Sequence, residues 1–528
     1  MVVDKSVKYD RQLRLWGDHG QDALGKASVC LINATATGTE TLKNIILPGV
    51  GRFVIVDDQI LTSSNVGNNF FLSPSSLGQP RGQVAYEFLQ ELNPDVLGEF
   101  INSSLTNVLS SDLFTTMSLV VATDLTEDQL IKLSELLWKL DIPLLTSISY
   151  GLISYVRLSV KEHWVCETHP DNPRIDLRLD KIHMIPGLLQ WIDDQNLDTM
   201  SNEEFMHTPY LVILYKKLSE WRNVTKQNFP SSFKDKKLIK DLVRNAIRPS
   251  KSEHEIDEEN FTEALNAVNS VFNPSRLDEE LTALFTDVKC QSLTAESTFD
   301  WVLCRALCDF VSSSGEGLLP VKGSVPDMRS DTSRYVQLQT FYKNANDRDV
   351  KNVRQRTLDH LTQLGRHHES VSLAEVARFC RGELALVKTK SLHEELTSEL
   401  PLVERSIEES FDSLLVYYVL LRAANHFRVI YGHWPGELSN EAVEGDIPLL
   451  KTCVNKLLNR IGARAGSVSI ECMHELCRWG GGEVASVAAF TGAVTAQEAI
   501  KLITKQYVPI NHTYIFSAIT STSETFPL

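Results

Sequence analysis

The chain has 528 residues, of which 43% are hydrophobic and 23% are charged, a composition typical of globular proteins that bury a large core. Its formal net charge of −16 disfavours binding to nucleic acid or to anionic membranes, because such surfaces select clustered lysine and arginine. No stretch approaches the length of a membrane span, and the first residues lack the apolar core of a signal peptide. We therefore expect a protein of the cytoplasm or the nucleus whose cysteines are reduced thiols.

The first 165 residues alternate between short apolar runs and segments of helical spacing. The runs are rich in β-branched residues, as buried strands are. Strands joined by helices at this spacing imply right-handed crossovers and a mostly parallel sheet. The sequence therefore predicts a Rossmann-like α/β domain, with strands near 27–32, 52–58, 95–102, 118–123 and 142–146.

The rest of the chain has a different pattern. Helical periodicity dominates 166–479, which predicts a large, mainly α-helical insert. A small-residue helix and a final strand follow in 480–528. A lone helix and strand cannot bury their apolar faces. We therefore expect 1–165 and 480–528 to form one α/β domain that is interrupted by the insert.

The turn after the first strand has lost most of a phosphate-binding pattern. Such a turn needs glycines so that the backbone approaches the phosphate at a helix N-terminus. Only the last glycine, which lets the helix pack on the strand, remains. The sequence thus predicts a nucleotide-binding fold with a degenerate site, its G-x-G-x-x-G positions being Asn33, Ala34, Thr35, Ala36, Thr37 and Gly38.

Several motifs occur in an order that resembles the ThiF/MoeB-like adenylation domain of ubiquitin-like protein activating enzymes. They are YDRQLRLWG (9–17), VDD (56–58), SSNVGNNFF (63–71), LGQPRGQVA (77–85) and AAFTGAVTAQEAIKLIT (488–504). The whole chain is most similar to the non-catalytic subunit of the heterodimeric enzyme that activates the neddylation modifier. The resemblance implies a regulatory subunit that is inactive alone and supports adenylation and thioester formation by a catalytic partner.

The resemblance also places the nucleotide-contacting positions of the family. The ribose acceptor falls on Gln59, two positions after Asp57, where working sites have an acidic residue. A phosphate-contacting arginine position falls on Asn68, and a phosphate-contacting lysine position falls on Arg81. The acidic magnesium position, Asp124, is retained. With the other positions changed, we interpret Asp124 as an N-cap of the helix that begins near residue 126.

One functional arginine is retained in the N-terminal segment. In dimeric family members an arginine of this segment reaches across the dimer to the partner's ATP phosphates, and it matches Arg11. A guanidinium stays charged and binds two phosphate oxygens at once. The alternative is that Arg11 and Arg14 form ordinary salt bridges. We favour the role in trans for Arg11 and a structural role for Arg14.

The resemblance implies no cofactor of the chain's own, with ATP and magnesium bound by the partner subunit. It further implies contacts with the ubiquitin-like modifier and, through the complex, with the conjugating enzyme. We expect no metal site, because Cys472 and Cys477 lack the C-x-x-C spacing of structural zinc. The composition of the segment 323–342 is compatible with a place in the core. The resemblance instead implies that this segment contacts the catalytic partner, with Asp327, Met328, Tyr335, Leu338 and Gln339 at the interface.

Two alternative functions remain open at this point. One is a self-sufficient activating enzyme that uses Asp124 for magnesium and Cys166, which lies between His163 and His169, as nucleophile. The other is an NAD-dependent oxidoreductase, since a strand, turn and helix followed by an acidic strand end suit a Rossmann fold. The absent glycines disfavour both. Cys304 and Cys308, four residues apart on the apolar side of a helix, are explained by packing.

Overall fold

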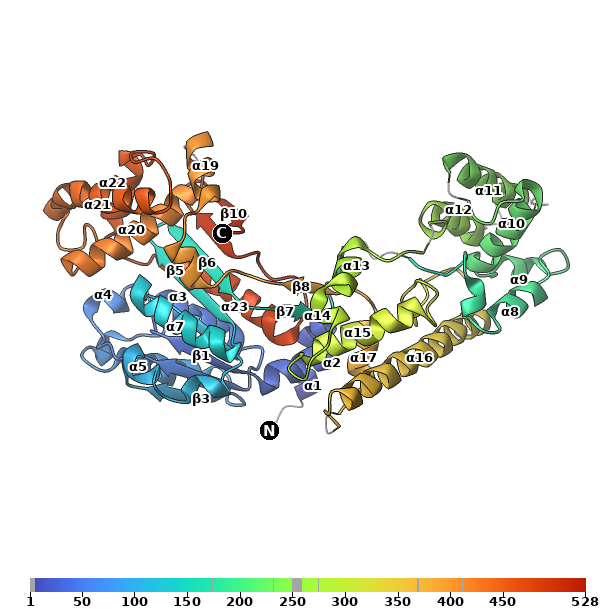
Figure 1. The fold of residues 1–528 in the computed structure, drawn as a ribbon, viewed down its shortest axis with the longest axis horizontal. Helices are drawn as coiled ribbons and strands as arrows, with labels where there is room; N and C mark the ends of the chain where they lie inside the picture. Colours follow the sequence, from blue (N-terminus) through green and yellow to red (C-terminus); the bar gives the residue numbers. More distant parts are fainter. Residues whose placement is uncertain are drawn as a thin grey trace. The chain divides into compact units, whose positions relative to one another are not determined.

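The computed structural model describes residues 5–171, 175–230, 232–248, 259–273, 275–367, 370–410 and 413–528. The chain forms two compact units (Figure 1). The sheet unit comprises Met1–Val165 and Leu386–Leu528, and the helical unit comprises Cys166–Ala385. The insert predicted for 166–479 is therefore divided, because 386–479 cluster with the sheet and the second structural boundary lies at 385.

The sheet unit is built on eight strands in the order β10-β9-β6-β5-β4-β1-β2-β3. The first five strands of the chain run parallel, and β6, β9 and β10 extend the sheet in antiparallel pairings. The predicted α/β class with a mostly parallel sheet is confirmed. The strands are β1 (Ser28–Ile32), β2 (Arg52–Val56), β3 (Leu97–Ile101), β4 (Leu119–Ala122), β5 (Leu144–Tyr150), β6 (Ile153–Ser159), β9 (Thr513–Ser517) and β10 (Thr522–Phe526).

Helices cover both faces of this sheet, as the apolar runs of its central strands require. Every residue of β4 is buried, and in β1 and β2 only the first residue is partly exposed. Two helices precede β1, namely α1 (Lys5–Lys8) and α2 (Asp10–Lys26). The helices between the parallel strands are α3 (Ala36–Ile46), α4 (Ser63–Val66), α5 (Arg81–Glu91), α6 (Leu105–Val108) and α7 (Glu127–Leu140).

The C-terminal helix α23 (Ala485–Thr504) packs along α3. Gly492 makes this close approach possible, because a Cβ atom there would lie 2.6 Å from Cβ of Glu40 and 2.9 Å from the amide nitrogen of Thr41. The two ends of the sequence thus share one core. The remaining helices of the sheet unit are α18 (Leu392–Thr397), α19 (Pro401–Glu409), α20 (Leu415–Tyr431), α21 (Asn440–Arg460) and α22 (Ile470–Trp479).

A partly buried ionic cluster joins α7 to α20 and α21. The carboxylate of Glu127 lies 2.7 Å from Nε of Arg422, 3.1 Å from Nη2 of Arg460 and 3.4 Å from Nε2 of His426. Burial acts to raise the pKa of Glu127, but the hydrogen bond with His426 and the charge of Arg422 outweigh it and lower the pKa to about 2. The carboxylate is therefore ionised at neutral pH.

The helical unit is organised around α16 (Thr332–Gln363). Its core includes Leu338 and Tyr342 of α16, packed with residues of α10 and α12. A short two-stranded sheet pairs β7 (His163–Val165) with β8 (Ala385–Val387). The other helices are α8 (Leu188–Asp194), α9 (Asn202–Met206), α10 (Tyr210–Thr225), α11 (Phe233–Asn245), α12 (Glu259–Val271), α13 (Glu279–Thr286), α14 (Val288–Gln291), α15 (Phe299–Ser312) and α17 (Leu373–Cys380). Among the described residues, no helix combines the length and apolarity needed to cross a membrane.

Candidate functional site

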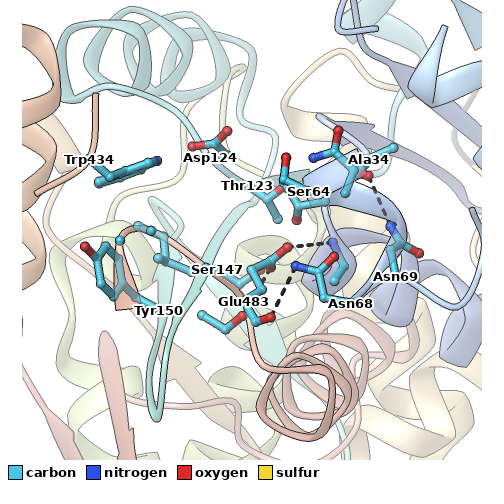
Figure 2. A pocket seen from close by; sticks show the side chains of 18 of the residues that line it. Ala34, Ser64, Asn68, Asn69, Thr123, Asp124, Ser147, Tyr150, Trp434 and Glu483 are labelled. Carbon is cyan, nitrogen blue, oxygen red and sulfur yellow. Dashed lines mark hydrogen bonds between the residues drawn. The ribbon is translucent and has the colours of Figure 1, made fainter. Parts of the chain in front are cut away.

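A cavity of about 380 Å³ opens in the sheet unit beyond the carboxyl ends of β1 and β4 (Figure 2). The strand order reverses here, because β1 lies between β2 and β4, and ligands of open α/β sheets bind at such a switch point. Its wall includes the first turn of α3 and the 480–483 segment. The lining side chains that decide its chemistry are those of Asn68, Asp124, Ser149, Trp434, Glu437 and Glu483.

The turn between β1 and α3 keeps its shape without the first two glycines. Asn33 adopts a left-handed backbone with φ of 66°. Its side-chain amide donates to the backbone carbonyl oxygens of Thr123 (2.9 Å) and Asp124 (3.1 Å). Thr35 caps α3 by accepting from the amide of Gly38. A Cβ atom on Gly38 would lie 2.9 Å from Cδ1 of Leu31, so this glycine serves helix–strand packing.

The N-terminus of α3, where a phosphate would bind in this fold, holds the carboxylate of Glu483. One oxygen accepts from the amide of Ala36 (2.8 Å), and the other accepts from the amide (3.0 Å) and hydroxyl (2.6 Å) of Thr37. The hydroxyl of Ser149 also lies 3.1 Å from this carboxylate. Free amides and the helix dipole favour an anion here, and the chain supplies its own. Burial raises the pKa of Glu483, although these hydrogen bonds act against the rise.

Sequence reasoning missed Glu483. The available signal was an acidic residue directly after three glycines, 480–482, at the start of a C-terminal helix that was expected to return to the sheet. The free amides at a helix N-terminus need hydrogen-bond acceptors, and an anion is favoured among them. Neither observation shows that the carboxylate of Glu483 lies at the N-terminus of α3.

The predicted phosphate-contacting position, Arg81, is bound to Asp57. Its Nε lies 2.7 Å and its Nη2 3.2 Å from the two carboxylate oxygens, and both side chains are buried. Asp57 also accepts from the amides of Ala34 and Gln59. The side chain of Gln59 is exposed, donates to Asp58 and does not line the cavity. Asp57 and Arg81 therefore form an internal ion pair, and Gln59, at the predicted ribose acceptor position, lies outside the lining of the cavity.

Asn68 and Asp124 line the cavity and have partners within the chain. The side-chain amide of Asn68 donates to the backbone carbonyl of Glu483 at 3.2 Å, as Figure 2 shows. Asp124 forms an ion pair with Arg428, whose guanidinium lies 4.4 Å from the centre of the Trp434 ring. The interpretation of Asp124 as an N-cap is wrong, because Thr126 caps α7. Its carboxylate fixes Arg428 beside the cavity instead.

The lining residues do not fit a nucleoside triphosphate. Two cationic side chains lie at the cavity in the described structure, and both are paired: Arg81, which lines it, with Asp57, and Arg428, beside it, with Asp124. Asp124, Glu437 and Glu483 contribute carboxylates. A triphosphate carries several negative charges and needs cations or free amides close by. The cavity offers it carboxylates and an occupied helix N-terminus.

The two N-terminal arginines have different surroundings. Arg14 forms an ion pair with Asp10 at 3.1 Å, one turn earlier on α2. Arg11 is exposed on the same helix, and within the described part of the chain it makes neither a hydrogen bond nor an ion pair. The helix breaks at Gly17, where φ is 68°. Both arginines are exposed, but Arg14 already has a partner within the chain, whereas Arg11 has none within the described residues.

The predicted interface residues lie in the helical unit at the start of α16 and in the segment before it. The hydroxyl of Tyr335 donates to Asp327 at 3.0 Å, which joins the two segments. Asp327 and Gln339 are exposed, and Met328 is half-buried. The inclusion of Leu338 is corrected by the structure, because its side chain is completely buried in the core of its own unit and offers no surface.

The cysteine and histidine residues near 166 do not form a recognisable nucleophile. Burial lowers the pKa of His163 to about 4, so its imidazole is neutral at pH 7. Its Nε2 atom is buried without a hydrogen-bond partner in the described structure. A neutral, buried imidazole gives no positive charge to stabilise a thiolate. Among the described residues, no group of three or more His, Cys, Asp or Glu side chains is arranged to hold a metal ion.

Comparisons with known proteins agree with this geometry. The ThiF family matches residues 9–528. The chain is 42% identical to the NEDD8-activating enzyme E1 regulatory subunit of Xenopus laevis, with 100% of this chain and 99% of the relative covered. It belongs to the family of NEDD8-activating enzyme E1 regulatory subunits. Gallus gallus has a family member that is 43% identical, with 99% and 98% covered, and the Arabidopsis thaliana member named AXL is 36% identical over the full length of both chains.

Membership in the NEDD8-activating enzyme E1 regulatory subunit family confirms the resemblance inferred from the motifs. It favours the regulatory reading over a self-sufficient activating enzyme and over an NAD-dependent oxidoreductase. It also indicates that the enzyme to which such subunits belong uses ATP and magnesium.

Proposed function

We propose that the chain is the regulatory subunit of a heterodimeric activating enzyme for the ubiquitin-like modifier NEDD8, and that the catalytic partner binds the ATP and magnesium. The observation that carries this proposal is the carboxylate of Glu483 on the first amides of α3. An anion already fills the position of the phosphate, and Arg81 is held by Asp57. Adenylation therefore takes place on the partner, and this chain supports it structurally and in trans.

Arg11 is proposed as the group that acts in trans. Its exposure and its lack of partners within the described chain support this role, because a side chain that reaches another subunit must be free in its own. A guanidinium at the partner's phosphates stabilises the negative charge that builds up as the modifier's carboxylate attacks the α-phosphate. The neighbouring Arg14, already paired with Asp10, keeps a structural role.

The partner is proposed to contact the start of α16. Asp327, Tyr335 and Gln339 present polar groups there, and the buried Leu338 holds the helix in place beneath them. The exposed Val336 adds an apolar contact on the same turn. The assembled enzyme would contact the modifier and, through the complex, the conjugating enzyme. We place this activity in the cytoplasm or the nucleus.

ATP–pyrophosphate exchange with NEDD8 present tests the proposal. The assay is run with this chain alone, with the catalytic subunit alone and with their mixture. We expect exchange that depends on the mixture, and titration calorimetry of this chain alone is expected to detect no ATP binding. Exchange or ATP binding by the isolated chain would overturn the proposal, because both require the α3 terminus to accept a phosphate.

A further inference from the structure

The first two turns of α2, which carry Arg11, are attached to the sheet unit at both ends. Tyr9 comes directly before the helix and Trp16 ends the second turn, and both side chains are buried. Arg11 lies between them and is exposed, with no partner among the described residues. The backbone of this segment therefore determines where the guanidinium can reach, and the two buried ends hold that backbone.

Asn93 holds the N-terminal end of the segment. It lies between α5 and β3, and only 1% of its surface is exposed. Its side-chain amide donates to the hydroxyl of Tyr9 (3.1 Å) and to the backbone carbonyl of Ile46 at the end of α3 (2.9 Å). Its side-chain oxygen accepts from Nζ of Lys8 at 2.6 Å. One buried side chain thus joins the residues before α2 to a helix of the sheet core.

Packing and charge restrict the same end further. A Cβ atom on Gly49 would lie 2.6 Å from the hydroxyl oxygen of Tyr9, so the ring fills space that a glycine leaves open. Nζ of Lys8 also lies 2.7 Å from the carboxylate of Asp95. A buried hydroxyl and a buried amide each cost free energy unless they are paired, and here they are paired with one another. Tyr9 is therefore fixed both by its shape and by its hydrogen bond.

Trp16 holds the other end of the segment. Its indole nitrogen donates to the side chain of Gln21 at 3.1 Å, and its backbone carbonyl accepts from the side chain of Gln506 at 2.8 Å. The helix is broken immediately afterwards at Gly17, where φ is 68°. Because of this break, the later part of α2 does not extend its own direction into the segment. The direction of the segment depends instead on its two anchors, Tyr9 and Trp16.

We propose that Asn93 is a positioning residue for Arg11 in the adenylation reaction, an inference that rests on the role in trans proposed above. Asn93 touches no substrate. It fixes Tyr9, so that Arg11, two residues later, leaves α2 in a set direction and only its side chain has to be ordered at the phosphates. A misplacement of about 1 Å can lower a rate by about 100-fold, so a loosened anchor should be visible in catalysis.

A double-mutant cycle in ATP–pyrophosphate exchange, with the assembled heterodimer and NEDD8, tests this role. Asn93→Ala should lower kcat by about tenfold with little change in the KM for ATP, because the contact that Arg11 makes in the transition state is weakened. In the Arg11→Ala background the same change should lower kcat by less than about twofold, since no guanidinium is left to misplace. Tyr9→Phe removes only the oxygen that Asn93 binds and should lower kcat by about two- to fivefold, again only when Arg11 is present.

The matched control is Asn260→Ala in the helical unit. Asn260 is also a buried asparagine, and its side-chain amide donates to the backbone carbonyls of Phe205 (2.8 Å) and Thr208 (3.0 Å). Its loss costs a similar amount of stability, but kcat should stay within about twofold of wild type.

The outcomes separate this inference from the proposed function. If Asn93→Ala and Tyr9→Phe lower kcat equally with and without Arg11, or if Asn93→Ala lowers it no more than Asn260→Ala, the positioning role is overturned while the role of Arg11 stands. Where Asn93→Ala fails to form the heterodimer, Tyr9→Phe decides by the same criterion. An unchanged kcat in Arg11→Ala alone would overturn the role in trans, and the positioning role with it.

Discussion

The hydroxyl of Thr37 donates a hydrogen bond of 2.6 Å to the carboxylate of Glu483, which lies 446 positions later in the sequence. This bond belongs to a set that satisfies the N-terminus of α3 without any ligand. The phosphate position of the fold has thereby become an internal contact between the two ends of the chain. We expect the stability of the sheet unit, and the proposed lack of nucleotide binding by this chain, to depend on the same carboxylate.

Replacing Glu483 by alanine should destabilise the sheet unit. The amides of Ala36 and Thr37 and the hydroxyl of Thr37 would lose their acceptor, which costs about 1–3 kcal/mol. Urea unfolding followed by fluorescence measures the change. The matched control is Glu524→Ala, because Glu524 is exposed on β10 and no such network surrounds it. Equal stability of the two variants would contradict a structural role for the Glu483 carboxylate.

Glu127→Gln should remove a pH-dependent part of the stability. The pKa of Glu127 is lowered from its ordinary value of 4.5 to about 2 in the folded chain. The ionised carboxylate therefore stabilises the fold by about 3 kcal/mol at neutral pH. This contribution is complete above about pH 4.5 and is lost as the pH falls towards 2. The stability difference between wild type and variant should be constant from pH 7 to 5 and shrink below that, as measured by thermal unfolding. A difference that grew at lower pH would contradict the assignment.

Arg11→Ala should reduce ATP–pyrophosphate exchange by the assembled enzyme by about 100-fold, because one charge-stabilising donor at the phosphates is lost. Arg14→Ala removes a neighbouring guanidinium that is paired with Asp10, so exchange should stay within about twofold of wild type. Gel filtration shows whether each heterodimer still forms. Equal losses for both variants, or loss of the complex with Arg11→Ala, would argue against a role in trans.

Gly492→Ala should destabilise the packing of α23 on α3 by about 1–3 kcal/mol, since the new methyl group would overlap Glu40 and the backbone of Thr41. The control is Gly25→Ala in α2, where a Cβ atom meets nothing within 4 Å. That change should leave stability the same or raise it by up to about 1 kcal/mol, because alanine is the better helix former. In thermal unfolding, the midpoint temperature should fall for Gly492→Ala and should stay the same or rise for Gly25→Ala.

The parallel part of the fold follows from local pattern. The apolar runs of 27–32, 52–58 and 118–123 correspond to β1, β2 and β4, because strands that are buried on both faces must be continuously apolar. The strand expected near the end of the chain corresponds to β9, whereas β6, the hairpin partner of β5, and β10, the hairpin partner of β9, were not predicted. β6 follows β5 after a two-residue turn at Gly151 and Leu152, and polar residues such as Ser147, Ser154 and Arg157 interrupt both strands, so the sequence marks neither the turn nor the second strand clearly.

Features that depend on tertiary contact could not be predicted from local pattern. The helices of 386–479 have the same periodicity as those of the helical unit, yet Leu415 and Leu420 share a core with Tyr150 and Ile153 of the sheet. The partner of Asp124 is Arg428, about 300 residues later. The degeneracy of the phosphate turn was visible at Asn33–Gly38, but the carboxylate that fills the site was not.

The division of the sheet between the two ends of the chain has a consequence during synthesis. Strand β6 pairs with β5 on one side and with β9 on the other, and about 350 residues separate β6 from β9 in the sequence. At about 5–20 residues per second, the ribosome needs about 20–70 seconds to deliver β9, α23 and the carboxylate of Glu483. Throughout that interval the nascent chain has an open β6 edge and an α3 whose first amides lack the Glu483 carboxylate. We expect both to attract unrelated strands or chaperones. Truncation near the C-terminus should therefore damage solubility far more than the few missing residues suggest, with the nascent chain accumulating in aggregates or on chaperones.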